Sequence, residues 1–450
     1  MKTTTNYDDF SKGSIASHLV RLAVPMTLAQ LVNVLYNIID RMFIGRLPVD
    51  ATNALTGLGV AFPICTIIIA FANLIGLGSS PLFSIERGRG NDEEAKYIMG
   101  NAFVMLVIIG FILSITGLVF KKPILYMLGA SDVTYQYASS YISIYLLGNI
   151  FVMLSLGLNT FINAQGFAKT GMLTVSIGAV TNIILDPVLI FVLNLGVSGA
   201  AIATVISQFI AALWTFHFLT GKKTIIKLSP KYFKLKSHRV LSALGLGLAP
   251  FTMSFTNSLI AVINNINLAA YGGDIYIASM TVINSVREVV QMPVSGISDS
   301  AKPIISYNYG AKENKRIKTT IQYMTASLII YSFAVTILVE LFAKQMIFFF
   351  NDDPKLLEIG VKSLRLYFAA FMFMAFQFSG QTVFTALGKA KNAVFFSLFR
   401  KVFLVIPLVY LLPLLGLGVD GVFIAEPVSN IIGGLCCFIA MYFIVYRKLD

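Results

Sequence analysis

Long apolar runs separated by short polar breaks organise this chain from end to end. Each run is about 20 to 30 residues long, and about 20 apolar residues are enough to cross a bilayer as a helix. The runs lie near 18–44, 54–81, 96–119, 136–162, 168–194, 198–219, 240–270, 277–305, 318–341, 358–386, 391–413 and 419–446. The pattern predicts twelve transmembrane helices, and therefore an all-α polytopic membrane protein.

An internal repeat divides the runs into two sets of six. LGVSGAAIA at 195–203 matches LGVDGVFIA at 417–425 in six of nine positions, an offset of 222 residues. AQGFAK at 164–169 and ALGKAK at 386–391 share that offset, and Pro25 pairs with Pro250 near it. Because an even number of helices returns the chain to the same side, we expect two parallel six-helix bundles related by a pseudo-two-fold axis along the membrane normal. The expected parts are a cytoplasmic tail at 1–17, an N-terminal lobe at 18–219, a basic cytoplasmic linker at 220–239 and a C-terminal lobe at 240–450.

Composition supports a membrane protein and gives its orientation. Hydrophobic residues make up 57% of the chain and charged residues 12%, whereas about a quarter of a soluble protein is charged. The net charge of +13 lies in short loops, which indicates positive-inside topology rather than nucleic-acid binding. Both termini are therefore predicted to be cytoplasmic, since the loops of the other side hold few basic residues: Arg46, Lys121, Lys122, Lys344 and Lys355.

Asn182 and Asp186 lie one helical turn apart in the apolar stretch TNIILDPVLIF at 181–191. A carboxylate at such a depth costs about 2.5–3.5 kcal/mol on insertion scales and usually marks a functional site. Pro187 follows directly and frees polar backbone that a cation or a water can use. The alternative is a proline-kinked helix in which the aspartate is merely capped or paired.

Asp40 and Thr204 are predicted to lie at a depth similar to that of Asp186. Together with Asn182 they form a set of oxygen ligands suited to a hard cation such as Na⁺. Two neighbouring carboxylates also tend to share a proton. We therefore expect an ion-coupling site for H⁺ or Na⁺ here, although Asp40 is close enough to its helix end to be solvated or paired with a loop charge instead.

Other polar residues inside the runs suggest further roles. Pro25 lies in the inner part of the first helix, and a kink there is a candidate hinge below Asp40. Glu426 precedes Pro427 much as Asp186 precedes Pro187. For the remaining charges we expect structural ion pairs between Asp299 and Lys302 and around Arg400 and Lys401, whereas Arg287 with Glu288 could line a pathway or pair.

Several absences narrow the function. There is no GxxxxGK[ST] phosphate loop, no HExxH and no serine–histidine pair at a suitable depth. The three cysteines, Cys65, Cys436 and Cys437, show no metal-ligand spacing. We therefore expect no enzyme and no cofactor beyond the coupling ion, with transport driven by an ion gradient.

Three stretches resemble the multidrug and toxic compound extrusion (MATE) family of ion-coupled exporters: KPIISYNYGAKENKRIK at 302–318, NIILDPVLIF at 182–191 and LGVSGAAIAT at 195–204. The resemblance implies two six-helix bundles that open alternately to either side of a bacterial cell membrane. It also implies roles for individual residues, with bending and ion coupling at Pro25, Tyr36 and Asp40, the cation site at Asn182, Asp186 and Thr204, and a cavity amide at Asn159.

One branch of that family uses acids of the C-terminal half, but the seventh and tenth runs here carry amides and no central carboxylate. The chain thus resembles the branch that couples in the N-terminal lobe. We expect a monomeric antiporter for amphiphilic, mostly cationic compounds, in contact with lipid and not with nucleic acid. Its substrate cavity is predicted to include Tyr36, Asn37, Asn159, Gln377 and Glu426. The rival functions are a flippase for lipid-linked precursors and, less favoured, an intramembrane enzyme.

Overall fold

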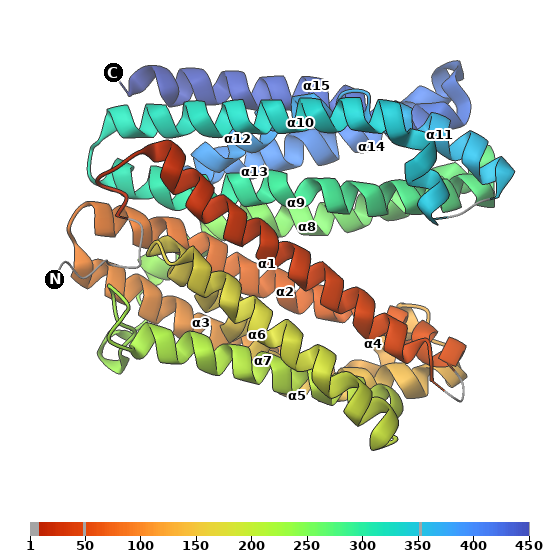
Figure 1. The fold of residues 1–450 in the computed structure, drawn as a ribbon, viewed down its shortest axis with the longest axis horizontal. Helices are drawn as coiled ribbons and strands as arrows, with labels where there is room; N and C mark the ends of the chain where they lie inside the picture. The colour runs from red at the N-terminus through yellow and green to blue at the C-terminus, as the bar shows by residue number, and fades with distance from the viewer. Residues whose placement is uncertain (1–8, 48–50, 351–352, 450) are drawn as a thin grey trace. The chain divides into compact units, whose positions relative to one another are not determined.

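The predicted apolar runs form helices in the computed structural model. The structure describes residues 9–47, 51–350 and 353–449, except for the side chains of residues 37, 41, 52, 258 and 274. Figure 1 shows the arrangement. The elements are α1 (Ile15–Ile44), α2 (Ala51–Gly88), α3 (Asp92–Val119), α4 (Lys121–Met127), α5 (Asp132–Ala164), α6 (Ala168–Pro187), η1 (Val188–Val192), α7 (Gly196–Thr220), η2 (Pro230–Tyr232), α8 (Ser237–Gly272), α9 (Asp274–Gly310), α10 (Asn314–Phe350), α11 (Pro354–Phe368), η3 (Phe371–Phe373), α12 (Met374–Ala386), α13 (Ala390–Leu398), η4 (Phe399–Val405), α14 (Ile406–Leu412), η5 (Pro413–Leu417), α15 (Gly418–Ile444) and η6 (Tyr446–Lys448).

These elements account for twelve membrane helices. In the described residues, 10 stretches are long and apolar enough to cross a membrane. One of them, Ala390–Lys448, contains two of the predicted runs, and α9 adds another that is too polar to qualify on hydropathy. The fold class predicted from the apolar pattern is therefore confirmed.

Prolines interrupt the regular helices at a few places. After Pro187, α6 continues as the π-helical turn η1, and Pro413 begins a similar turn, η5. A third π-helical segment, η4, lies just before Pro407. Because proline cannot donate its backbone hydrogen bond, the carbonyl one turn earlier is released and the local helix widens. The run predicted at 358–386 is also broken, into α11 and α12, at residues 369–373.

The chain forms two compact units. Unit 1 contains Val24–Gly247, and unit 2 contains Phe10–Ala23 together with Leu248–Asp450. The chain thus passes from one unit to the other within the first third of α1 and again within the first third of α8. In each helix a proline follows the passage within three residues, Pro25 in α1 and Pro250 in α8.

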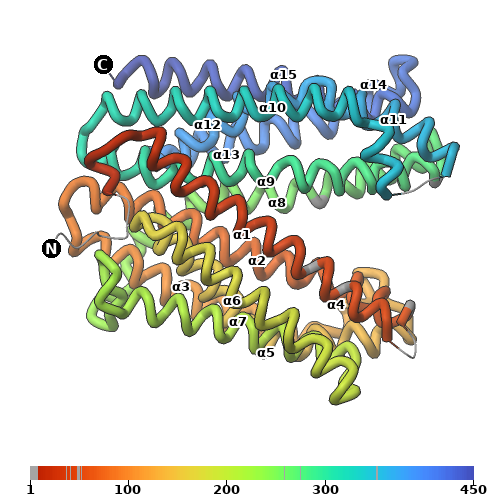
Figure 2. The backbone as a smooth tube through the Cα atoms, viewed as in Figure 1, coloured from red at the N-terminus to blue at the C-terminus, as the bar shows by residue number. Residues whose placement is uncertain are grey.

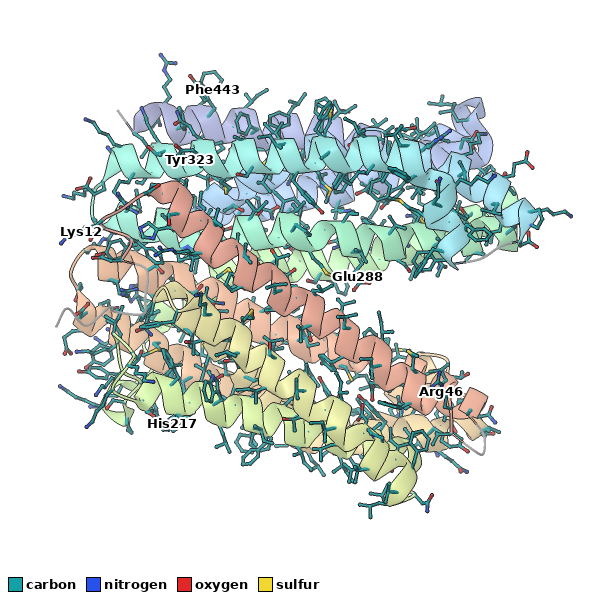
Figure 3. All side chains as sticks on the ribbon, in the orientation of Figure 1. Lys12, Arg46, His217, Glu288, Tyr323 and Phe443 are labelled. Carbon is teal, nitrogen blue, oxygen red and sulfur yellow. The ribbon has the colours of Figure 1, made fainter. Side chains whose placement is uncertain are left out.

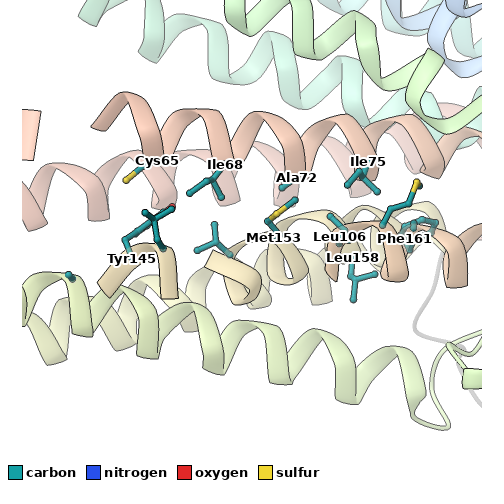
Figure 4. Packing of buried hydrophobic residues seen from close by; sticks show 14 of the residues in the cluster. Cys65, Ile68, Ala72, Ile75, Leu106, Tyr145, Met153, Leu158 and Phe161 are labelled. Atoms are coloured by element: carbon teal, nitrogen blue, oxygen red, sulfur yellow. The ribbon is translucent and has the colours of Figure 1, made fainter. Parts of the chain in front are cut away.

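In unit 1 the core lies mainly between α2 and α5, with α3 and α7 packed on either side. Figure 4 shows apolar side chains such as Ile68 and Ile75 of α2 opposite Met153 and Leu158 of α5. Helices α5, α6 and α7 lie side by side (Figure 2). This packing brings the C-terminal half of α6, with Asp186, against α7.

Helices α2 and α8 cross at backbone contact inside unit 1. A Cβ atom on Gly247 would lie 1.7 Å from the carbonyl oxygen of Leu74, and one on Gly78 would lie 2.1 Å from that of Ala243. Such distances leave no space for a methyl group. The two glycines therefore set how closely α2 and α8 approach.

We expect Gly247→Ala to lower the melting temperature of the purified protein, because the new methyl group must push two helices apart. Overpacking of this kind costs on the order of 1–3 kcal/mol. Gly59→Ala on α2 is the matched control, since its Cβ would meet nothing within 4 Å. Equal melting temperatures for the two variants would contradict the close crossing.

In unit 2, α9, α10, α12 and α15 pack around a second core, while large apolar side chains cover the outside. Tyr323 on α10 and Phe443 on α15 are 49% and 53% exposed and point outward (Figure 3). Exposed apolar side chains in this number suit a surface in contact with lipid hydrocarbon.

The start of the chain is held in unit 2 by Arg316, which lies in the stretch that resembles the family signature. Its guanidinium donates hydrogen bonds to the carbonyl oxygens of Phe10, at 2.9 and 3.1 Å, of Lys12 at 3.2 Å and of Gly13 at 3.1 Å. Phe10 is 2% exposed, and Asn308 donates to its carbonyl at 3.3 Å. We call residues 10–13, Asn308 and Arg316 the N-terminal clip.

Arg316→Gln is expected to open the N-terminal clip and to speed trypsin cleavage after Lys12 in the detergent-solubilised protein by about tenfold or more. The reason is that each lost hydrogen bond from a charged donor contributes about 1.5–3 kcal/mol. Mass spectrometry of the N-terminal fragment gives the rate. Lys315 is exposed and supplies the control, because trypsin should cleave Lys315→Gln at the wild-type rate. If Arg316→Gln is also cleaved at the wild-type rate, Arg316 does not hold the segment.

Candidate functional site

Helix α6 carries the amide and the carboxylate predicted to form the ion site, and they face α7. Asn182 donates from Nδ2 to Asp186 Oδ1 at 3.2 Å, across one helical turn. The same nitrogen lies 3.5 Å from Thr204 Oγ1 on α7. All three side chains are buried, so their polar atoms depend on one another.

Asp40 of α1 completes this group, which we call the carboxylate site. The carboxyl groups of Asp40 and Asp186 lie close enough to interact electrostatically. Two neighbouring buried carboxylates repel each other unless one of them carries a proton. The arrangement therefore suits one proton shared between two acids.

Two oxygens of the carboxylate site remain available for a ligand. Asn182 Oδ1 and Asp186 Oδ2 are buried, and neither accepts a hydrogen bond from any described residue. Amide and carboxylate oxygens are the ligands that hard cations prefer. No group of three His, Cys, Asp or Glu side chains in the described part of the chain could hold a metal ion, so any cation here needs the amide and hydroxyl oxygens as well.

Two tyrosines and a cysteine next to the carboxylate site were not predicted. Tyr141 of α5 lies next to Thr204 and in the field of Asp40. Tyr145, one turn further along α5, lies next to Cys65 of α2, and Figure 4 shows the two side chains facing each other. The i, i+4 spacing of Tyr141 and Tyr145 was the signal that could have revealed them.

The other residues predicted for unit 1 lie in different places. Tyr36 of α1 is near Tyr145, whereas the side chain of Asn37 lies outside the described part of the structure. Asn159 donates to the carbonyl of Gly171 at 3.2 Å. Because Gly171 precedes Asp186 by four turns, Asn159 is roughly 20 Å from the carboxylate site along α6.

In unit 2, Glu426 is not a free cavity carboxylate but the centre of a buried ion cluster. Arg400 Nη1 and Lys401 Nζ of η4 each lie 3.1 Å from Glu426 Oε1. Arg400 also donates to Asn430 Oδ1 at 2.7 Å. The structural ion pairing expected of Arg400 and Lys401 is confirmed, and their partner is now identified.

The remaining predicted charges of unit 2 have simpler surroundings. Lys302 pairs with Asp299 at 2.7 Å, as expected. Arg287 of α9 donates to the hydroxyl of Tyr367 at 2.9 Å. Gln377 is buried and donates from Nε2 to the carbonyl of Phe396 at 3.3 Å, while its Oε1 accepts no hydrogen bond from the described residues.

A profile of the MatE family matches this chain twice, at residues 25–188 and 250–411. One match falls in each repeat, and each begins at a proline, Pro25 or Pro250. The two matches together cover more than half of the chain.

Curated relatives align with almost the whole sequence. The multidrug export protein MepA of Staphylococcus haemolyticus is 29% identical, over 97% of this chain and 94% of its own length. The protein of the same name from Staphylococcus aureus strain N315 is 25% identical, over 98% of this chain and 96% of its own length.

Solved structures share the fold. A crystal structure described as MATE in the bent conformation superposes with a TM-score of 0.93 at 23% identity, covering 100% of this chain and 99% of that one. An outward-facing multidrug resistance MATE family transporter of the MOP superfamily gives a TM-score of 0.91, again at 23% identity and with the same coverage.

Proposed function

The chain belongs to the MatE family, and from this premise we propose that it is a multidrug exporter coupled to an inward flow of H⁺ or Na⁺ at the carboxylate site. It is a multi-pass membrane transporter rather than an enzyme. The exported compounds are amphiphilic and mostly cationic, and the relatives named as multidrug export proteins support this choice.

The observation that carries the proposal is the pair of contacting carboxyl groups of Asp40 and Asp186 at bilayer depth in unit 1. Such a pair can bind a proton or a metal cation, and it can release that ion when another positive charge takes its place. The ion can drive export only if it binds the two alternately open states with different affinity. Pro25, where α1 passes between the units, is the proposed hinge for that difference.

Coupling through unit 1 also agrees with the chemistry of unit 2. The buried carboxylate of Glu426 already has two cationic partners, so it is a poor acceptor for a further cation. We further propose that both termini are cytoplasmic, that the protein works as a monomer and that lipid surrounds its exposed apolar side chains. Tyr36, Asn37, Asn159 and Gln377 remain proposed contacts for substrate.

The test is efflux of the fluorescent cation rhodamine 123 from proteoliposomes under an imposed H⁺ gradient or an imposed Na⁺ gradient. Efflux driven by one gradient, and absent from protein-free liposomes, would support the exporter and name the ion. No efflux under either gradient would reject a cation exporter and would favour the flippase for lipid-linked precursors.

A further inference from the structure

Three cations of unit 2 share a single buried carboxylate. Arg400 and Lys401 both contact Oε1 of Glu426, each at 3.1 Å. The two cations and the glutamate are at most 5% exposed. Arg287 lies close enough to interact electrostatically with Glu426. We call these four residues the cationic cluster, and its positive charges exceed its negative charges by two.

Arg287 is the cation of this cluster with room for another partner. Its hydrogen bond goes to the neutral hydroxyl of Tyr367, and no described carboxylate lies within 4.0 Å of its guanidinium. Glu288 interacts with it electrostatically, but that side chain is exposed and points about 100° away around α9. Arg287 itself is the least buried of the three cations.

The cationic cluster occupies the place in unit 2 that the carboxylate site occupies in unit 1. The repeat offset of 222 relates three pairs of residues in the two groups: Thr204 and Glu426, Tyr145 and Tyr367, and Cys65 and Arg287. The neighbouring residues Tyr145 and Cys65 thus correspond to Tyr367 and Arg287, which are joined by a hydrogen bond. At the same offset leucines, Leu404 and Leu408, replace Asn182 and Asp186.

An exchange of side-chain size makes room for a buried arginine in unit 2. In unit 1, Gly178 on α6 faces Ala211 on α7, with 3.5 Å between an added Cβ and the Cβ of Ala211. The equivalent residues of unit 2 are Arg400 and Gly433. A Cβ on Gly433 would lie 2.7 Å from Cγ of Arg400, so the glycine provides the space for the arginine. The three cations of unit 2 therefore stand where unit 1 has small uncharged residues, Gly178, Ala179 and Cys65.

We propose that the cationic cluster is an anion site of unit 2 that takes a carboxylate, with Arg287, its least buried cation, as the ligand. This inference rests on the proposed export function and names an amphoteric substrate class, cationic at one end and carboxylate-bearing at the other. Arginine suits this ligand because its planar fork matches the two oxygens of a carboxylate. The ligand also supplies negative charge where the cluster lacks it.

Two dyes provide the test, because rhodamine 110 carries a free carboxyl group where rhodamine 123 carries its methyl ester. Fluorescence polarisation measures the binding of each dye to the full-length purified protein and to Arg287→Gln. Loss of a charged hydrogen-bond partner is expected to weaken rhodamine 110 binding by about tenfold or more. Rhodamine 123 binding should stay within about twofold. Arg287→Lys keeps the charge and should restore part of the rhodamine 110 affinity.

The remaining outcomes separate the sources of the carboxylate and the two proposals. Both dyes could bind every variant alike, while sodium acetate raises the melting temperature of wild type but not that of Arg287→Gln. Sodium chloride at equal ionic strength is the control and should not raise it. In that case the site stands and takes a free carboxylate. If Arg287→Gln weakens both dyes equally, or changes neither dye nor the acetate response, the anion site is rejected. Wild type that binds rhodamine 110 but not rhodamine 123 would instead reject the cation-export proposal alone.

Discussion

Gradient-driven efflux of rhodamine 123 should fall to the level of protein-free liposomes when Asp186 is replaced with asparagine. The amide cannot take up a proton, and it leaves Asp40 without the acid with which it shares one. Without an ion that distinguishes the two open states, the gradient cannot move substrate. We therefore expect a loss of roughly tenfold or more in the initial rate in proteoliposomes.

A folded but uncoupled transporter is distinguishable from a misfolded one. Asp186→Asn should still exchange labelled for unlabelled rhodamine 123 when no ion gradient is present. Asp420→Asn is the matched control, because that acid pairs with Lys362 in unit 2 and should leave efflux near the wild-type rate. Wild-type efflux from Asp186→Asn would place the coupling ion elsewhere.

Glu426→Gln is expected to cause the largest loss of stability of any single change in unit 2. Removal of this carboxylate leaves Arg400 and Lys401 buried with no counter-charge, and breaking a buried pair in this way costs about 3–5 kcal/mol. Thermal unfolding of the purified protein, followed by scanning fluorimetry, should show a strongly lowered melting temperature.

Two further variants test the reason for that loss. Adding Lys401→Met to Glu426→Gln removes one of the stranded cations and should recover part of the melting temperature. Glu340→Gln removes a pair with Arg365 that is about half exposed on both sides, and such surface pairs contribute about 0–1 kcal/mol. If Glu340→Gln and Glu426→Gln destabilise equally, burial does not set the effect.

The helices were predictable because a segment that crosses the bilayer must satisfy its own backbone hydrogen bonds. An apolar run of about 20 residues has one low-energy form in hydrocarbon, so hydropathy alone located the helix of almost every run. The breaks within helices were less visible. Pro187 and Pro413 explain two of the π-helical turns, but nothing in FAAFMF at 368–373 signals that α11 ends at Phe368.

The polar contacts within one helix were predictable from residue spacing, whereas those between helices were not. Asn182 and Asp186 were predictable as neighbours because they are four residues apart on one helix. Tyr141 and Cys65 reach the same site from α5 and α2, and their positions depend on packing between helices. Likewise Glu426 and Lys401 are 25 residues apart, and sequence spacing gives no reason to pair them.

The N-terminal clip also sets an order of events during synthesis. Phe10 and the arginine that holds it, Arg316, are 306 residues apart. At about 5–20 residues per second, the ribosome needs roughly 15–60 s to make the chain between them. Throughout that time residues 10–13 have no final place to bind. Residues 10–13 are therefore fixed late, and their protection from protease begins only after α9 and the start of α10 have been made.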